Sequence, residues 1–230
     1  MSKITKKVYP VMGMHCAACA NNVEKIVKKQ EGVEDASVNL AAAVLTVDFN
    51  SDVVSPEQLK DAVMKIGFDL IIGEDNSMEE QEEAEHSYYE QLQRKTVVAW
   101  IFALPVAFMG MFFMDFPGIN WWMLVLSLPV LFYSGHAFYV NAWKQAKHFT
   151  SNMDTLVALS TSIAFLFSLF NTLYPRFWYE QGLEPHVYYE AATVIIAFVL
   201  VGKLMEEKAK GKTSMAIRKL MGLQPKTARI

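Results

Sequence analysis

The order of apolar and polar positions divides the chain into a mixed N-terminal part and a strongly apolar remainder. Between residues 6 and 72, short alternating segments bounded by glycine predict strands, and apolar residues at helical spacing predict helices. The expected elements, in order strand, helix, strand, strand, helix and strand, are 6–13, 19–30, 33–39, 43–49, 55–66 and 68–72. This βαββαβ order predicts an α+β ferredoxin-like fold.

Local signals mark the ends of the two predicted helices. Gly32 follows the first helix at the position where a left-handed cap is easiest. Ser55 is a good N-cap for the second helix, and Pro56 suits its first helical position.

From residue 95 the pattern changes to long apolar segments. Four of them have roughly the 20 residues that a helix needs to cross a bilayer. The expected α-helical spans are approximately 96–114, 121–143, 154–174 and 187–206. The predicted organisation is a soluble domain at 1–73, an acidic linker at 74–94, a transmembrane bundle at 95–210 and a further segment at 211–230. The acidic stretch reads either as a solvated linker or as a helical extension of the first span.

Composition and charge support a multi-pass membrane protein. The hydrophobic content of 53% exceeds the soluble average of about 45–50%. The net charge of -3 combines an acidic stretch at 74–90 with a basic stretch at 203–229. That basic run directly follows a span and has no interleaved aromatics, which argues against a nucleic-acid partner.

The distribution of basic residues predicts the orientation in the membrane. Arg94 and Lys95 precede the first span, and Lys144 and Lys147 lie in the second connection. With the basic run after the fourth span, the positive-inside rule places both termini in the cytosol. No secretory signal precedes the cysteine motif. We therefore expect an integral protein of the cell or inner membrane, in contact with lipid.

The two cysteines of the chain stand in one motif, Gly-Met-His-Cys-Ala-Ala-Cys, at residues 13–19. One pair cannot form a larger disulfide framework, and a cytosolic location keeps the thiols reduced. Thiolates at Cys16 and Cys19, where a loop enters a helix, can hold one soft metal ion. The alternative is a redox pair of the thioredoxin type, which normally has an aromatic or proline nearby, whereas Ala17 and Ala18 fill the gap here.

Three further residues are candidates for metal chemistry within the spans. An ionisable side chain inside a membrane segment is a functional hypothesis by default, which singles out Glu190 and Glu206. Met153, at the start of the third span, offers a soft thioether. Each also has a simpler interpretation: Glu206 or its neighbour Glu207 as an interfacial charge, Glu190 as a paired group, and Met153 as one of 13 methionines that mostly pack.

The loop at residues 13–19 and its spacing to Gly67-Phe68 resemble the heavy-metal-associated domain family. The resemblance implies that Cys16 and Cys19 bind one Cu(I). His15 before the first cysteine favours copper over zinc, and Phe68 favours a transporter's own domain over a free chaperone. We interpret His15 as an exposed loop residue rather than a ligand, and Met14 as core packing.

The remaining motifs resemble the heavy-metal-transporting P-type ATPases of the copper-exporting subgroup. They are Ser151-Asn152-Met153-Asp154-Thr155-Leu156, Tyr189-Glu190-Ala191-Ala192 and Gly202-Lys203-Leu204-Met205-Glu206. The resemblance implies that Met153 and Glu206 form the cytosolic site where the ion enters, and that Glu190 lines the release path.

The same resemblance implies a helix kink at Ser134-Gly135. Gly135, Lys144 and Lys147 would then form a basic platform on which a soluble copper chaperone, or the cysteine pair itself, could dock.

The resemblance covers the whole chain but only the front of the family. The chain contains no phosphorylation or nucleotide-binding motif and no catalytic residue, so ATP and Mg belong to the missing part. Leu223-Gln224-Pro225 lies near the expected first strand of an actuator domain. We therefore expect the N-terminal fragment of a P-type ATPase that exports Cu(I), an enzyme by family that does not hydrolyse ATP alone. The alternatives are a stand-alone membrane-anchored protein that binds or transfers copper, and a Zn/Cd-type pump.

Overall fold

The computed structural model describes the backbone of residues 4–72, 77–113, 116 and 118–222. These residues fall into two compact units. The first comprises Met1–Tyr89 together with Lys203–Ile230, and the second comprises Glu90–Gly202.

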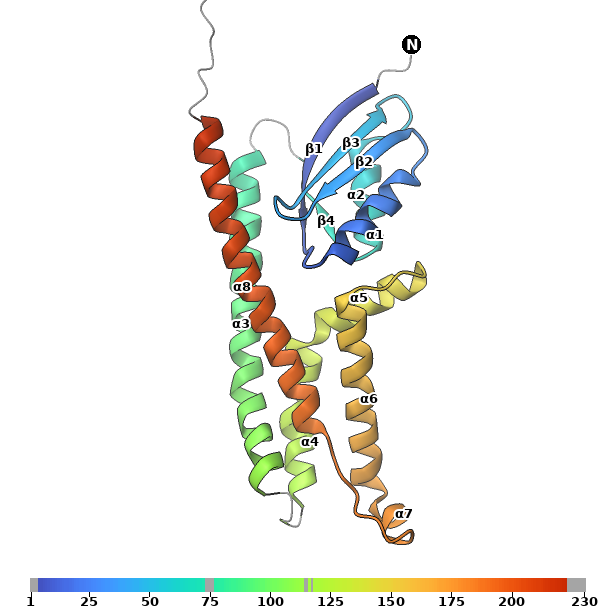
Figure 1. The fold of residues 1–230 in the computed structure, drawn as a ribbon, viewed down its shortest axis with the longest axis vertical. Coiled ribbons are helices and arrows are strands. Elements are labelled where there is room, and N and C mark those ends of the chain that lie inside the picture. Colours follow the sequence, from blue (N-terminus) through green and yellow to red (C-terminus); the bar gives the residue numbers. More distant parts are fainter. Residues whose placement is uncertain (1–3, 73–76, 114–115, 117, 223–230) are drawn as a thin grey trace, which may run out of the picture. The chain divides into compact units, whose positions relative to one another are not determined.

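The N-terminal part of the first unit is a four-stranded antiparallel sheet with two helices (Figure 1). The strand order in the sheet is β2-β3-β1-β4, and the elements alternate as predicted, which confirms the ferredoxin-like fold. The elements are β1 (Ile4–Met12), α1 (Ala17–Lys28), β2 (Val33–Asn39), β3 (Val44–Asn50), α2 (Pro56–Lys65) and β4 (Asp69–Leu70).

The helix ends follow the local signals. Ser55 caps α2 in a capping box, in which its Oγ accepts from the Gln58 amide at 3.4 Å while Gln58 Oε1 accepts from the Ser55 amide at 2.9 Å. Gly32 has a φ of +90°, and a Cβ there would lie 2.8 Å from the Val53 side chain. Both the backbone conformation and the available space therefore require glycine at this position.

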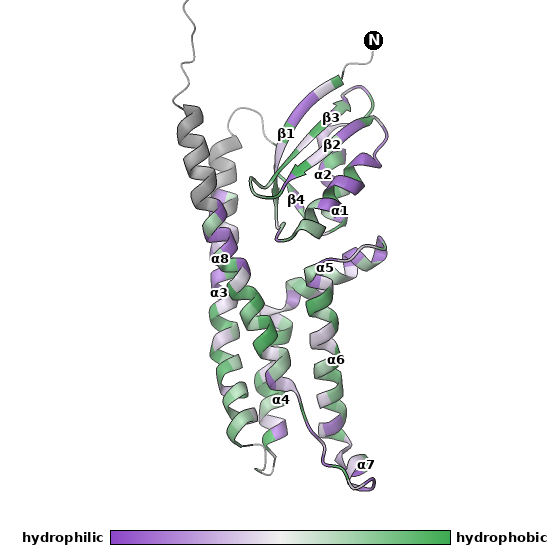
Figure 2. Ribbon diagram, viewed as in Figure 1, coloured by the Kyte–Doolittle hydropathy of each residue, from purple (hydrophilic) through white to green (hydrophobic). Residues whose placement is uncertain are grey.

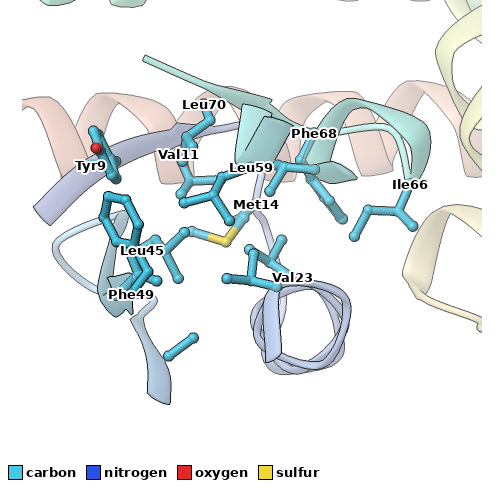
Figure 3. Close-up of a cluster of buried hydrophobic side chains, with 14 of the residues drawn as sticks. Tyr9, Val11, Met14, Val23, Leu45, Phe49, Leu59, Ile66, Phe68 and Leu70 are labelled. Atoms are coloured by element: carbon cyan, nitrogen blue, oxygen red, sulfur yellow. The ribbon is translucent and has the colours of Figure 1, made fainter. Parts of the chain in front are cut away.

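The core of this domain lies between the sheet and the two helices. Figure 3 shows the Met14 side chain pointing into it, with Val23, Leu45 and Leu59 around its sulfur. Met14 is 1% exposed, so its interpretation as a core residue is confirmed. Because the core comes from residues 9–72 alone, this segment has a complete hydrophobic cluster of its own.

The remainder of the described chain is mainly helical, and the stretches 96–112, 119–133, 153–173 and 191–202 are largely apolar (Figure 2). They are α3 (Ser77–Phe112), α4 (Ile119–Pro129), the π-helical η1 (Val130–Ser134), α5 (His136–Lys147), α6 (Met153–Leu173), α7 (Pro175–Tyr179) and α8 (Tyr189–Gly222).

By length and composition, two of the described helices can cross a membrane. They are His86–Phe112 within α3 and the whole of α6, and the bent pair Ile119–Ser134 and His136–Lys147 adds a third if it forms one span. The fourth expected span falls in α8, where the charged residues Glu190, Lys203 and Glu206 interrupt the apolar pattern. The number of four spans stays a prediction.

Two long helices extend beyond the expected spans. The acidic stretch is helical from Ser77 onward, as a continuation of α3, while residues 73–76 lie outside the described part. Helix α8 continues to Gly222, and the strand expected near Leu223-Gln224-Pro225 also lies outside the described residues.

The predicted kink at Ser134-Gly135 is present, with an angle of 58° between the two halves of the bent pair. The π-helical turn η1 precedes it, and a Cβ on Gly135 would lie 2.8 Å from the Leu131 carbonyl oxygen and 3.1 Å from Ile196 Cδ1. The Ser134 hydroxyl donates to the Lys95 carbonyl of α3 at 3.0 Å. The kink therefore has identifiable causes: a π-helical turn, close packing at a glycine and a fixed contact with the neighbouring helix.

Met14 gives a direct test of core packing in the soluble domain. We predict that Met14→Leu changes the free energy of unfolding of residues 1–73 by less than about 1.5 kcal/mol, because the side-chain volume is conserved. Met14→Ala should destabilise the domain by about 2–5 kcal/mol, because it leaves a cavity. Urea unfolding of the metal-free domain measures both.

The same two variants separate packing from metal ligation. Met14→Leu removes the thioether and keeps the shape, so it should leave the Cu(I) affinity unchanged. A loss of affinity in a fully folded Met14→Leu domain would show instead that the sulfur is a ligand.

Candidate metal centre

The cysteine loop places Cys16 at the N-cap of α1. Gly13 starts the loop with a φ of +85°, and buried Met14 anchors it in the core. Cys16 is extended (φ -156°, ψ 158°), and its Sγ accepts a hydrogen bond from the Cys19 amide at 3.2 Å. The first cysteine thus occupies the position where serine or aspartate usually caps a helix.

Both thiols lie at one end of a helix. Cys19 lies in the first turn of α1, Cys16 is half-buried, and neither residue is in a disulfide. The spacing therefore gives two sulfur donors on one helix end.

The donor set fits a metal of low coordination number. Within the described residues, no group of three or more His, Cys, Asp and Glu side chains comes together around a possible ion. Zn(II) normally takes four such ligands, whereas soft thiolates select Cu(I), which accepts fewer. The two thiols of this loop therefore suit an ion of low coordination number such as Cu(I).

His15 is not the exposed loop residue that we expected, because its side chain is only 2% exposed. Within the first compact unit, its Nδ1 lies 3.2 Å from Glu206 Oε2 and 3.5 Å from Glu207 Oε1. Its Nε2 lies 3.0 Å from the Tyr88 hydroxyl, and the two rings are stacked. The two carboxylates lie 191 and 192 residues from His15 in the chain, so no local pattern could have predicted these contacts.

Lys210 completes this cluster of charges. Its Nζ lies 2.8 Å from Glu206 Oε1 and 3.6 Å from Glu207 Oε1, and it also donates to the Met14 carbonyl. Glu206 therefore lies between an imidazole and an ammonium group. Sequence reasoning assigned no role to Lys210 or Tyr88; the only available signal for Lys210 was its spacing of one helical turn from Glu206.

Met153 is the first residue of α6, directly after an N-cap. Asn152 Oδ1 accepts from the Thr155 amide at 3.0 Å, and buried Asp154 accepts from Asn141 Nδ2 of α5 at 2.8 Å. These bonds fix the start of α6 and hence the position of Met153. Met153 belongs to the second unit and Glu206 to the first, so their pairing as one site stays a prediction.

Glu190 lies in the first turn of α8 and is half-buried. Its Oε2 is buried and has no hydrogen-bond partner among the described residues. Gly110 of α3 packs against this side chain, since a Cβ on Gly110 would lie 3.1 Å from Glu190 Cγ and 3.2 Å from its Cδ, and the sequence had not singled out this glycine.

The residues of the expected docking platform extend from the kink to the last turn of α5. Gly135 is at the kink, and Lys144 and Lys147 lie in the last turn of α5. Lys147 Nζ lies 5.5 Å from the centre of the Trp143 ring, and this ring is largely exposed. The pairing combines a positive charge with an aromatic face.

Comparisons with known proteins show what the chain is similar to. The heavy-metal-associated domain family matches residues 8–69. A probable copper-transporting ATPase, PacS, of Synechococcus elongatus is 40% identical over 240 residues, which cover 99% of this chain and 32% of PacS. A copper-exporting P-type ATPase of Staphylococcus aureus is 33% identical over 226 residues, which cover 96% of this chain and 28% of that protein. The chain thus spans about a third of the length of these relatives.

Among solved structures, the N-terminal domain of a potential copper-translocating P-type ATPase from Bacillus subtilis, in the Cu(I)-loaded state, is 43% identical. The match covers 30% of this chain and 86% of that domain, with a TM-score of 0.29. The family match, the cysteine loop and the membrane helices point to one conclusion. Residues 8–69 match the heavy-metal-associated domain family, and almost the whole chain is similar to the corresponding third of copper-transporting P-type ATPases.

Proposed function

We propose that the chain captures Cu(I) on Cys16 and Cys19 and serves ATP-driven copper export as part of a P-type ATPase. The observation that carries the proposal is the pair of thiols at the N-terminus of α1, with no third donor among the described residues. A site of this kind binds a soft monovalent ion and leaves its coordination shell open. An open shell allows exchange with a further thiolate or thioether.

Copper then passes to Met153 and Glu206, where the ion enters the membrane part. Support for Glu206 comes from His15, which directly precedes the first metal-binding cysteine and contacts the Glu206 carboxylate. The metal-binding loop and this carboxylate can therefore be neighbours. A thioether with a carboxylate holds Cu(I) less tightly than two thiolates, so the ion can move onward. Release past Glu190 completes the route.

The driving reaction belongs to the whole pump. Because the chain spans about a third of its relatives' length, phosphorylation by ATP and Mg is assigned to the remainder.

A soluble copper chaperone is the partner proposed for the platform of Gly135, Lys144 and Lys147. The exposed ring of Trp143 beside Lys147 gives such a partner an apolar and a charged contact point.

Two other functions use the same metal site. A membrane-anchored protein that binds or hands over copper needs the cysteine pair but no ATP chemistry. A Zn/Cd-type pump needs more donors than the described part of the centre provides. We favour copper export because the copper-transporting relatives align with 96–99% of the chain.

The cysteine site is tested by two substitutions of Cys16. Loss of a supporting group around a metal site already weakens binding by about 10- to 100-fold. We therefore predict that Cys16→Ser and Cys16→Ala both lower the Cu(I) affinity by more than about 100-fold. Competition with a chromophoric Cu(I) chelator under anaerobic conditions measures this, and full affinity in a Cys16→Ser, Cys19→Ser double variant would contradict the assignment.

The same two substitutions test whether the Cys16 side chain caps α1. In the metal-free domain, Cys16→Ser keeps an oxygen that can accept from the Cys19 amide, whereas Cys16→Ala does not. The alanine variant should be less stable by about 0.5–2 kcal/mol, the usual cost of a lost N-cap. Urea unfolding compares the two, and equal stability would remove the capping role.

The route is tested in the complete pump. We predict that Met153→Leu lowers Cu(I) transport into vesicles while Cu(I) binding by the soluble domain stays unchanged, because the thioether is lost from a different site. Met111→Leu is the matched control, since Met111 is 75% exposed on α3. Transport in Met153→Leu equal to that of the control would exclude Met153 from the route.

A further inference from the structure

The loop between α5 and α6 holds an aromatic side chain in an unfavourable position. Phe149 is 99% exposed, has a φ of +53° in the left-handed region, and directly follows the C-cap of α5. Its amide donates to the Ala146 carbonyl at 3.1 Å. The Thr150 amide donates to the Gln145 carbonyl at 3.1 Å, and the two bonds together form the Schellman pattern of helix ends. Phe149 therefore occupies the position that glycine usually takes in this motif.

The surrounding contacts maintain this position although it is unfavourable. A left-handed backbone is disfavoured for every residue with a Cβ, and a phenyl ring in water leaves a large apolar surface exposed. Gln145 is fully buried, and its side-chain oxygen accepts from the Thr150 hydroxyl, which adds to the backbone bond between the same two residues. Strain that a fold maintains in this way is a reason to look for a function of the side chain.

The loop lies at the end of a candidate membrane span. Met153, four residues after Phe149, is the first residue of α6, which can cross a membrane by length and composition. Four residues reach at most about 14 Å, and the interfacial layer of a bilayer is roughly 5–8 Å thick on each side. Figure 1 shows α5 running across this end of α6. Phe149 is thus within reach of the layer in which aromatic side chains are enriched.

The charge around Phe149 fits an anionic lipid surface. Lys144 and Lys147 lie in the last turn of α5, and residues 136–152 contain no aspartate or glutamate. Anionic headgroups attract basic segments of this kind, and an aromatic ring beside them can enter the headgroup layer. Lipid is also the partner that the fold itself brings to this place, because hydrogen bonds such as that from Tyr139 of α5 to α6 hold α5 against a helix that can enter the bilayer here.

We propose that Phe149 anchors the end of α5 in the membrane surface beside the start of α6, with Lys144 and Lys147 against the anionic headgroups around it. Transfer of the phenyl ring out of water then offsets the strain of the left-handed turn. The proposal goes beyond the proposed function and does not depend on which ion the chain carries. A soluble chaperone would meet a helix whose end is fixed at the membrane surface.

The test uses residues 1–230 in lipid nanodiscs, in a background with Cys16→Ser and Cys19→Ser. Because the chain has only two cysteines, this background accepts a single spin label at His148→Cys, an exposed position. Collisions of the label with oxygen and with a water-soluble nickel chelate show whether the end of α5 lies in lipid or in water. We expect the label to lie in the interfacial layer when the nanodiscs contain phosphatidylcholine and phosphatidylglycerol.

Two substitutions of Phe149 separate a lipid role from a packing role. Glycine suits the left-handed turn better than phenylalanine, so a role in the turn alone predicts that Phe149→Gly leaves the label where it was. The lipid role predicts that Phe149→Gly lowers the ratio of inserted to free label by about 10-fold or more, because no ring leaves water. Phe149→Tyr keeps the ring and should keep the label inserted. Tyr179→Gly is the matched control, since Tyr179 is 61% exposed and follows the other end of α6.

The lipid composition tests the contribution of charge. We expect Lys144→Ala and Lys147→Ala each to lower the ratio of inserted to free label by about fivefold in the anionic nanodiscs. In nanodiscs of phosphatidylcholine alone, the two substitutions should have no effect, because the headgroups carry no net charge.

Three results would overturn the proposal. The label may lie in water in both lipid compositions, which would leave Phe149 to a soluble partner; Phe149→Gly may leave the inserted fraction unchanged; or Tyr179→Gly may cause the same loss. None of these results bears on copper, because the background lacks both cysteines. A failure of the proposed function would instead show as absent Cu(I) binding by the chain with its cysteines intact.

Discussion

Every charged group that leaves water in this chain needs a partner, and this constraint explains most of its functional candidates. Glu206 and Glu207 meet it with His15 and Lys210, at distances between 2.8 and 3.6 Å. Asp154 meets it by accepting from Asn141. Glu190 differs, since one of its oxygens is buried without a partner among the described residues. A group that the protein leaves unsatisfied is the natural place for a transported cation to bind in passing.

The cysteine loop shows how core packing serves the metal site. Met14 lies in the core two residues before Cys16, so the loop cannot move away from the end of α1 without breaking that packing. Gly13 provides the left-handed turn that brings the chain to this point. The Cys19 amide then donates to Cys16 Sγ, which fixes the first sulfur relative to the backbone of the second cysteine. The donors are held in place before the ion arrives, which reduces the ordering cost of binding.

Local chemistry made much of the fold predictable. The Gly32 turn and the Ser55 cap follow from the residue types at these positions, and each is present. The kink at Gly135 is also present, but it was expected only from the family resemblance. The cysteine pair at the start of a helix was predictable from the motif and the apolar spacing that follows it. His15 was predicted wrongly, because its burial depends on Glu206 and Glu207, 191 and 192 residues away, which no local pattern reveals.

The same limit applies to the release site. Periodicity identified Glu190 because an acidic residue inside an apolar segment is conspicuous. It could not identify which residues of other helices lie near Glu190. Gly110 of α3 is an ordinary residue of an apolar helix by its sequence, and only the folded structure places it against the Glu190 side chain. The number of membrane spans was difficult to predict for a related reason. The charged residues that give α8 its proposed function also interrupt the apolar sequence of the fourth expected span.

The proposed route can be understood as a change in donor type. Two thiolates bind Cu(I) strongly and are suited to taking it from a dilute source. In that route, Met153 with Glu206 offers one thioether and one carboxylate, which are weaker ligands for a soft ion. Affinity alone would therefore keep copper on the cysteines. Movement toward the weaker site has to be driven, and this requirement is the physical reason why the proposed route needs ATP. In the same proposal the cysteine pair selects the ion, and a carboxylate of α8 forms a neutral pair with it in the apolar layer.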